Sequence, residues 1–250
     1  MQVYLTLVRR EVGSYFLSLT GYVIIATVLL LLGLSFTDML AKLNAEPTDA
    51  PITEVFYITV YFWVILLLTA PVMTMRSFAQ EKFSGTYETL MTAPVSDGQV
   101  VLAKFTGAML FYLLTWLPLL AYIFVVHHYS SEERALDGWV IASTFLGISL
   151  IGCVYMSLGC FASALTRSQM IAAMISYGLG LALFLLSLRA LMPMPTTGWE
   201  AKLFAYISMT EHMQEFARGV VDTRYLVFYL SLTLSFLFLT WKVVESRRWK

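Results

Sequence analysis

Six long apolar runs, each free of Asp, Glu, Lys, Arg and His, divide the sequence. They occupy residues 12–37, 55–75, 105–126, 139–166, 168–188 and 225–241. A helix needs about 20 apolar residues to cross the hydrocarbon core of a bilayer, and a spanning helix satisfies its own backbone hydrogen bonds there. The pattern therefore predicts an all-α polytopic membrane protein, a single domain over 1–250. We place its six spans at about 20–41, 54–75, 105–127, 139–165, 169–190 and 225–243.

The first apolar run follows Arg9 and Arg10, a positive flank that also precedes secretory signals. The run is longer than the roughly 7–15 apolar residues of a signal sequence, and no clear A-x-A cleavage site follows it. We interpret it as a retained span. Before it, residues 3–17 place Leu5 and Val8 at helical spacing opposite polar residues, which is typical of a helix lying in the membrane interface. The alternative is that this segment is the start of a longer span.

A segment between the second and third spans, residues 76–104, carries turn signals at both ends of a short helical piece. The piece at 86–92 follows Gly85 and is stopped by a proline two residues later. Ser96 with Gln99 forms a capping box that starts the helix leading into the third span. A mere connector needs only a few residues. A compact helical segment of this length predicts docking of a cytoplasmic partner, with a solvated loop as the alternative.

Residues 192–224 predict one or two short external helices that lie on, or dip into, the outer leaflet. Ser208 with Glu211 is a second capping box, and Gly219 suits the position that ends the helix. Trp199 is one of several aromatic residues of the kind found at membrane interfaces.

Small residues recur at four-residue steps on two predicted spans. They are Ser149, Cys153 and Ser157 on the fourth, and Ala172, Ser176 and Gly180 on the fifth. Such faces let helices approach closely in lipid. They predict a packed bundle, but leave open whether the neighbouring helix belongs to the same chain or to a second copy.

Composition supports the membrane interpretation, and the charges predict an orientation. Hydrophobic residues make up 59% of the chain and charged residues 13%, against about 25% charged in ordinary soluble domains. The formal net charge is +0, which gives no general attraction for nucleic acid. Of the 16 Lys and Arg residues, ten fall on the side of the termini and six on the other. The positive-inside rule therefore predicts that both termini are cytoplasmic.

Motifs for catalysis and for metal or cofactor binding are absent from the sequence. Without GxxxxGK[ST], HExxH or CxxC, we expect no catalytic, cofactor-binding or metal-binding residue and no ATP hydrolysis by this chain. Cys153 and Cys160 suit a small-residue helix face. His127, His128 and His212 are expected at the surface or at helix caps. No ionisable residue lies near the middle of a predicted span, where a proton-coupled carrier usually has one. This predicts that energy is supplied from elsewhere.

Three stretches carry a resemblance to a known family. The first has RE, then SYF and GY, at 10–22; the second has MRSFAQEK, then GTxExL and APV, at 75–95; the third has HMQEFARGVVDTR at 212–224, leading to ESRRW at 245–249. Together they resemble the permease subunits of type 2 ATP-binding-cassette (ABC) transporters, most closely the bacterial branch that includes the gliding-motility-associated permease. The resemblance covers essentially the whole chain. Gln80 departs from relatives that often carry a second acid beside Glu81.

The resemblance implies an N-terminal interfacial helix, six spans, a coupling helix between spans two and three, and short external helices before the last span. It also implies pairing with a second permease, either a copy or a close paralogue. Each permease would dock on a separate cytoplasmic ATPase that binds ATP and Mg²⁺, for export across the bacterial inner membrane. A non-transporting anchor or scaffold for a cytoplasmic complex is the alternative function. The substrate class stays open.

Two sets of site residues follow from this interpretation. At the ATPase-coupling surface we expect Arg76, Glu81, Lys82, Gly85, Thr86, Glu88 and Leu90. In the external helical segment we expect His212, Glu215, Phe216, Arg218, Gly219 and Asp222.

Overall fold

The computed structural model describes residues 2–45, 53, 54, 56, 60–87, 95–129, 137–188, 203, 204 and 206–246. Its main helices are α1 (Gln2–Phe16), α2 (Leu19–Ala45), α4 (Tyr61–Thr74), α5 (Ala79–Ser84), α7 (Asp97–Trp116), α8 (Pro118–Tyr129), α9 (Gly138–Leu165), α10 (Gln169–Leu188), α12 (Met209–Ala217) and α13 (Thr223–Ser246). The described residues contain no β-strand. The predicted all-α fold is therefore confirmed.

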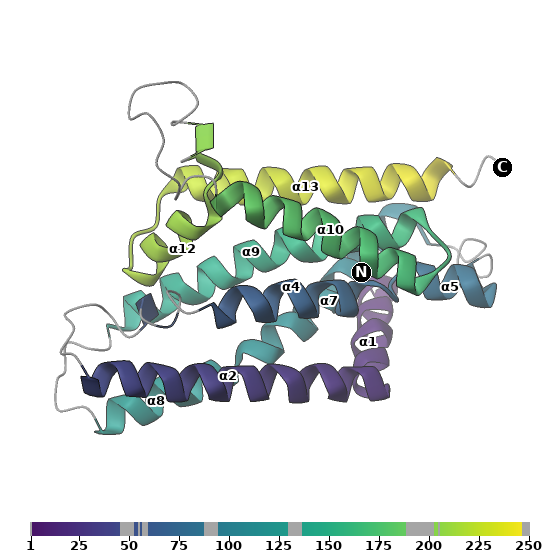
Figure 1. The fold of residues 1–250 in the computed structure, drawn as a ribbon. Coiled ribbons are helices and arrows are strands. Elements are labelled where there is room, and N and C mark those ends of the chain that lie inside the picture. Colours follow the sequence, from purple (N-terminus) through teal and green to yellow (C-terminus); the bar gives the residue numbers. More distant parts are fainter. Residues whose placement is uncertain are drawn as a thin grey trace.

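Six segments are long and apolar enough to cross a membrane. They are Leu19–Lys42, Tyr61–Ser84, Asp97–Val126, Gly138–Leu165, Gln169–Leu188 and Thr223–Ser246. Their number is the one that the apolar runs predict. Figure 1 shows that α1 runs across the direction of the spans, at the end of the bundle that also holds α5 and the last turns of α13. We call this the α5 end and the opposite one the α12 end.

Helix α9 forms the centre of the bundle and contacts α4, α7, α10, α12 and α13. Two glycines allow this close packing. A Cβ added at Gly152 would lie 2.2 Å from the ring of Tyr112, and one at Gly159 would lie 2.0 Å from Oγ1 of Thr74. Small residues on the fourth span therefore serve packing within this chain.

The small-residue face of the fifth span is also used internally. Ala172, Ser176 and Gly180 are all buried on α10, and the Tyr155 hydroxyl of α9 donates a hydrogen bond to the Gly180 carbonyl at 3.1 Å. The question left open by the sequence is thus answered for this face: its neighbour helices, α4 and α9, belong to the same chain.

The third span is broken, although the sequence predicts a single helix over 105–127. Helix α7 ends at Trp116 and α8 begins at Pro118. Proline has no N–H and its ring clashes with the carbonyl four residues earlier, so it interrupts a helix. The chain passes the break through a tighter turn, in which Leu117 N–H bonds Leu114 O at 3.2 Å. Beyond it, α8 packs on α2, where the rings of Phe36 and Tyr122 stack at 4.6 Å.

Candidate functional site

The second span continues past its apolar stretch through a turn that is fastened to α9. Residues 75–78 form this turn between α4 and α5. The hydroxyl of Ser163 accepts hydrogen bonds from Phe78 N–H and Ala79 N–H, each at 3.0 Å, and donates one to the Met75 carbonyl at 3.0 Å. One buried side chain thereby satisfies three backbone groups that the helix break leaves without helical partners.

Lys82 belongs to the predicted coupling surface, but its side chain points into the protein. It is buried on α5. Its ammonium donates to the carbonyl of Ala164, in the last turn of α9, and lies 5.3 Å from the ring centroid of Tyr87. Cations are favoured at helix C-termini, where backbone carbonyls lack partners. Lys82 therefore holds α5 against α9. Gly85, with φ of +75°, ends α5 three residues later.

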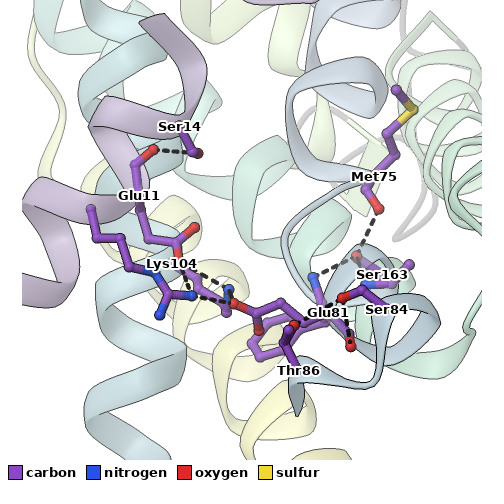
Figure 2. Close-up of polar contacts among 11 residues, drawn as sticks. Glu11, Ser14, Met75, Glu81, Ser84, Thr86, Lys104 and Ser163 are labelled. Atoms are coloured by element: carbon purple, nitrogen blue, oxygen red, sulfur yellow. Dashed lines mark hydrogen bonds and ion pairs between the residues drawn. The ribbon is translucent and has the colours of Figure 1, made fainter. Parts of the chain in front are cut away.

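An ion-pair cluster joins three helices at the α5 end. Lys104 on α7, only 3% exposed, pairs with Glu11 of α1 (Nζ–Oε1 3.0 Å) and with Glu81 of α5 (Nζ–Oε1 2.9 Å). Arg10 adds a hydrogen-bonded pair to the same oxygen of Glu81 at 2.6 Å. We call Arg10, Glu11, Glu81 and Lys104 the ionic joint. Figure 2 shows Lys104 between the two carboxylates.

The N-terminal helix is seated tightly on α7 beside this joint. A Cβ added at Gly107 would lie 2.7 Å from Cβ of Glu11. The ring of Tyr15 stacks on Phe111 with centroids 4.6 Å apart, and its hydroxyl donates to the Met73 carbonyl at 3.0 Å. Burial raises the pKa of Tyr15 well above its ordinary value, so the hydroxyl stays a donor.

The apolar face expected for α1 meets the bundle at most of its positions, but not at Leu5. Leu5, placed on that face, is 61% exposed, whereas Val8 is buried. The hydroxyl of Tyr4 lies 2.7 Å from the hydroxyl of Thr106 on α7. Tyr4, Arg10 and Glu11 take part in the packing because each has a polar partner on α7 or α5, which the periodicity of apolar residues does not reveal.

Beyond the ionic joint, the end of α5 is exposed. Phe83 is 78% exposed, and Gly85 and Thr86 are exposed beside it. Thr86 Oγ1 lies 2.9 Å from the Ser84 hydroxyl. The two remaining predicted coupling residues, Glu88 and Leu90, lie outside the described residues. Phe83 was not among the predicted site residues; the signal for it is an aromatic residue directly before the Ser-Gly break.

Arg76, also predicted for the coupling surface, lies half-buried at the turn after α4. Its Nε is buried without a hydrogen-bond partner. Of the predicted coupling residues, Glu81 and Lys82 are therefore buried in contacts within the chain, and Gly85 and Thr86 are exposed at the tip of α5. Arg76 is intermediate in burial.

At the α12 end, His212 is fully buried, so the expectation of a surface or cap position for it is wrong. Its ring stacks on Tyr225 with centroids 3.9 Å apart, and Nδ1 lies 3.2 Å from the Tyr229 hydroxyl. Helix α12 turns this face into the bundle because α9 carries Gly147 beneath it, where an added Cβ would lie 2.9 Å from Phe216. Backbone atoms of α12 are bound as well: the Ser143 hydroxyl donates to the Phe216 carbonyl at 2.7 Å.

The other residues predicted for the external segment shape the end of α12 and the start of α13. Arg218 pairs with Glu54 at 2.5 Å, and this hydrogen bond raises the pKa of Arg218 above its ordinary value. Gly219 has φ of +86°, the left-handed conformation expected for it. The Glu215 carbonyl accepts from Val220 N–H at 2.9 Å. Asp222 Oδ1 accepts from Arg224 N–H at 2.8 Å, which caps α13.

The arrangement of helices and polar contacts defines the class of protein. Within the described ranges, no three His, Cys, Asp or Glu side chains gather as metal ligands. The bundle has six spans, a helix lying across one end, and a structured extension of span two. Ion pairs fasten this extension to α1 and to α7. This is a multi-pass α-helical membrane protein whose polar contacts concentrate at the two ends of the bundle.

The comparison with protein families is specific. The family model described as ABC-2 family transporter protein matches residues 23–244. The chain therefore belongs to the ABC-2 transporter family and is a transmembrane permease of an ABC transporter. Permeases of this family work in general with a cytoplasmic ATPase. A search among curated proteins gives no match to the sequence.

Proposed function

We propose that this permease forms the translocation pathway of an exporter and that residues 76–104 receive the motion of a separate ATPase. Two such chains, or one with a close paralogue, would pair in a bacterial inner membrane with both termini in the cytoplasm. Two ATPase subunits would bind ATP and Mg²⁺, and this chain would hydrolyse nothing. The gliding-motility-associated branch is the subgroup that we propose for it.

The ionic joint is the observation that carries this proposal. The exposed tip of α5 begins two residues after Glu81, whose carboxylate is bonded to Lys104 on α7 and to Arg10 on α1. A push on the tip is therefore carried to the start of span three and to the helix lying across the bundle. Such a push supplies energy only if the ATP-bound partner favours one bundle state over another.

The docking surface that we propose consists of Phe83, Gly85 and Thr86, continued by Glu88 and Leu90. A large exposed aromatic side chain is the kind of residue that dominates binding energy at interfaces once it is desolvated. The neighbouring Glu81, Lys82 and Arg76 brace the extension. Their polar atoms face the protein or the pocket beside it.

Co-purification of the ATPase tests the docking surface. We expect Phe83→Ala to weaken retention of the ATPase by the purified permease about tenfold or more, as for a binding hot spot. Phe124→Ala is the matched control, because Phe124 on α8 is 69% exposed but lies in the half of the third span that leads to the α12 end. Glu88→Ala and Leu90→Ala, singly and together, extend the test. Full ATPase retention and ATP-driven transport in all these variants would refute the assignment.

Cysteine labelling tests the sidedness. Thr86→Cys and Val220→Cys place accessible thiols at the α5 and α12 ends, in a background where Cys153 and Cys160 are replaced by Ala. A membrane-impermeant maleimide should label position 86 only in inverted vesicles and position 220 only in right-side-out vesicles. Labelling of position 86 from the outside would contradict the proposed orientation.

A further inference from the structure

A pocket of about 260 Å³ lies beside the ionic joint, bordered by α1, the first two turns of α2, and the chain from the end of α4 through α5. Its wall is graded. Arg10, Arg76 and Lys104 supply positive charge, while Ile24 and Val72 supply an apolar part nearer the spans. The cavity lies at the end of the bundle that α1 crosses, and its lining is partly charged and partly apolar.

The charges of the pocket are not balanced. Its lining holds three cations, Arg10, Arg76 and Lys104, against two carboxylates, Glu11 and Glu81. Both carboxylates are already engaged by Lys104, and Arg10 adds a bond to Glu81. One positive charge is therefore in excess among the described lining residues, and the cation outside the ionic joint is Arg76.

Arg76 has unused capacity to bind an anion. None of the ion pairs between described residues includes it, and its Nε is buried without a hydrogen-bond partner. Leaving a buried charged donor unsatisfied is costly. A guanidinium presents its N–H groups in a planar fork that matches phosphate oxygens. A phosphate in the pocket that Arg76 lines is the kind of group that such a fork binds.

We propose that this pocket binds the phosphate group of an anionic phospholipid, with Arg76 as the main ligand and Arg10 at the opening. The apolar wall at Ile24 and Val72 favours a lipid over free phosphate, because only the lipid carries an apolar portion to cover it. The bound lipid would lie between α1 and the extension of span two. It would therefore hold together the same helices that the ionic joint fastens, independently of any ATPase.

Lipid retention by the purified full-length permease tests this proposal without the ATPase. Protein stripped of lipid in detergent is mixed with phosphatidylglycerol, with phosphatidylcholine or with inorganic phosphate, and bound lipid and thermal stability are measured. We expect phosphatidylglycerol to bind and to raise the melting temperature. Phosphatidylcholine should do neither, because its choline cation would lie beside Arg10, Arg76 and Lys104, and inorganic phosphate should do neither, because it has no apolar portion. Stabilisation by inorganic phosphate equal to that by phosphatidylglycerol would overturn the assignment to a lipid.

Charge variants distinguish the pocket from general attraction at the interface. Arg76→Gln should weaken phosphatidylglycerol binding about tenfold, the factor expected for one charge-assisted hydrogen bond. Arg167→Gln removes an exposed cation in the turn between α9 and α10, near the same end, and should leave binding within about twofold of wild type. Arg76→Lys keeps the charge without the planar fork and should fall between the two. Equal loss in Arg76→Gln and Arg167→Gln would overturn the proposal.

The two proposals fail separately. If phosphatidylglycerol binds equally to wild type and Arg76→Gln, the lipid site is wrong, whatever the ATPase does. If Phe83→Ala keeps the ATPase, the docking surface is wrong, and the lipid measurement is unaffected because it uses the permease alone.

Discussion

Replacing Lys104 with methionine should destabilise the permease more than the loss of any exposed ion pair. Methionine keeps an unbranched apolar side chain of similar shape and removes the ammonium group with its charge and its N–H donors. The change leaves Glu11 and Glu81 near each other with no cation between them. Arg10 still reaches Glu81 at 2.6 Å, but its distance to Glu11 is 3.8 Å, so Glu11 loses its close partner.

The magnitude follows from the geometry. Unit charges 3 Å apart interact by about 5 kcal/mol at an effective dielectric constant of 20, and Lys104 has two such contacts, at 3.0 and 2.9 Å. Part of this is offset because the carboxylates regain hydration through the adjoining pocket. Breaking a buried pair from one side costs about 3–5 kcal/mol, and the pocket places the expected loss near the lower limit. For a chain of this size, about 3 kcal/mol corresponds to a melting temperature lower by roughly 6–12 °C.

Thermal unfolding in detergent, followed by size-exclusion chromatography of the heated samples, measures this loss. Lys242→Met is the control, because Lys242 is exposed and pairs with Glu245 at 2.8 Å within α13. An exposed pair of this kind contributes about 0.3–0.5 kcal/mol. The added changes Glu11→Gln and Glu81→Gln should restore much of the stability of Lys104→Met, since they remove the unpaired charges. Equal melting temperatures for Lys104→Met and Lys242→Met would refute the reasoning.

Three further changes test side chains on α9 and α10, each by melting temperature in the same assay. Ser163→Ala should cost about 1–3 kcal/mol, because it leaves the buried N–H groups of Phe78 and Ala79 without their acceptor; an effect below that of Lys242→Met would contradict it. Gly159→Ala should cost about 1–3 kcal/mol through the clash with Thr74. Gly178→Ala, which meets nothing within 4 Å, should instead be neutral or stabilise the helix by up to about 1 kcal/mol.

Local rules were sufficient for the features that depend on neighbouring residues. Apolar run length predicts the number of spans. The capping box at Ser96 forms with both of its bonds to Gln99, and Gly85 and Gly219 adopt the left-handed conformations that end α5 and α12. Each feature is decided within a few positions of the chain, which is the range over which spacing and turn chemistry carry information.

The contacts of the candidate site depend instead on residues far apart in the sequence. The sequence indicates Glu81 for the coupling surface, but it does not pair Glu81 with Lys104, or Lys104 with Glu11. Ser163 lies on another span from the turn that it fastens. The sequence does not place His212 in the core, because nothing near it reveals that Gly147 of α9 leaves space for α12. Periodicity places a residue on a helix face, and only the packing of helices decides what that face meets.

The charges of the ionic joint also bear on how the orientation is fixed. Arg10 and Lys104 are two of the ten basic residues that predict cytoplasmic termini, yet both are paired with carboxylates in the folded protein. The positive-inside rule counts Lys and Arg near span ends and gives acidic residues little weight, so it applies to the chain as it inserts, before the joint forms. With Lys104 replaced by methionine, nine basic residues still face six. We therefore expect Thr86→Cys to be labelled from the same side in Lys104→Met membranes as in wild type, although the folded bundle is less stable. Dual labelling from both sides in the Lys104→Met variant would show that this lysine acts on topology rather than on the folded joint.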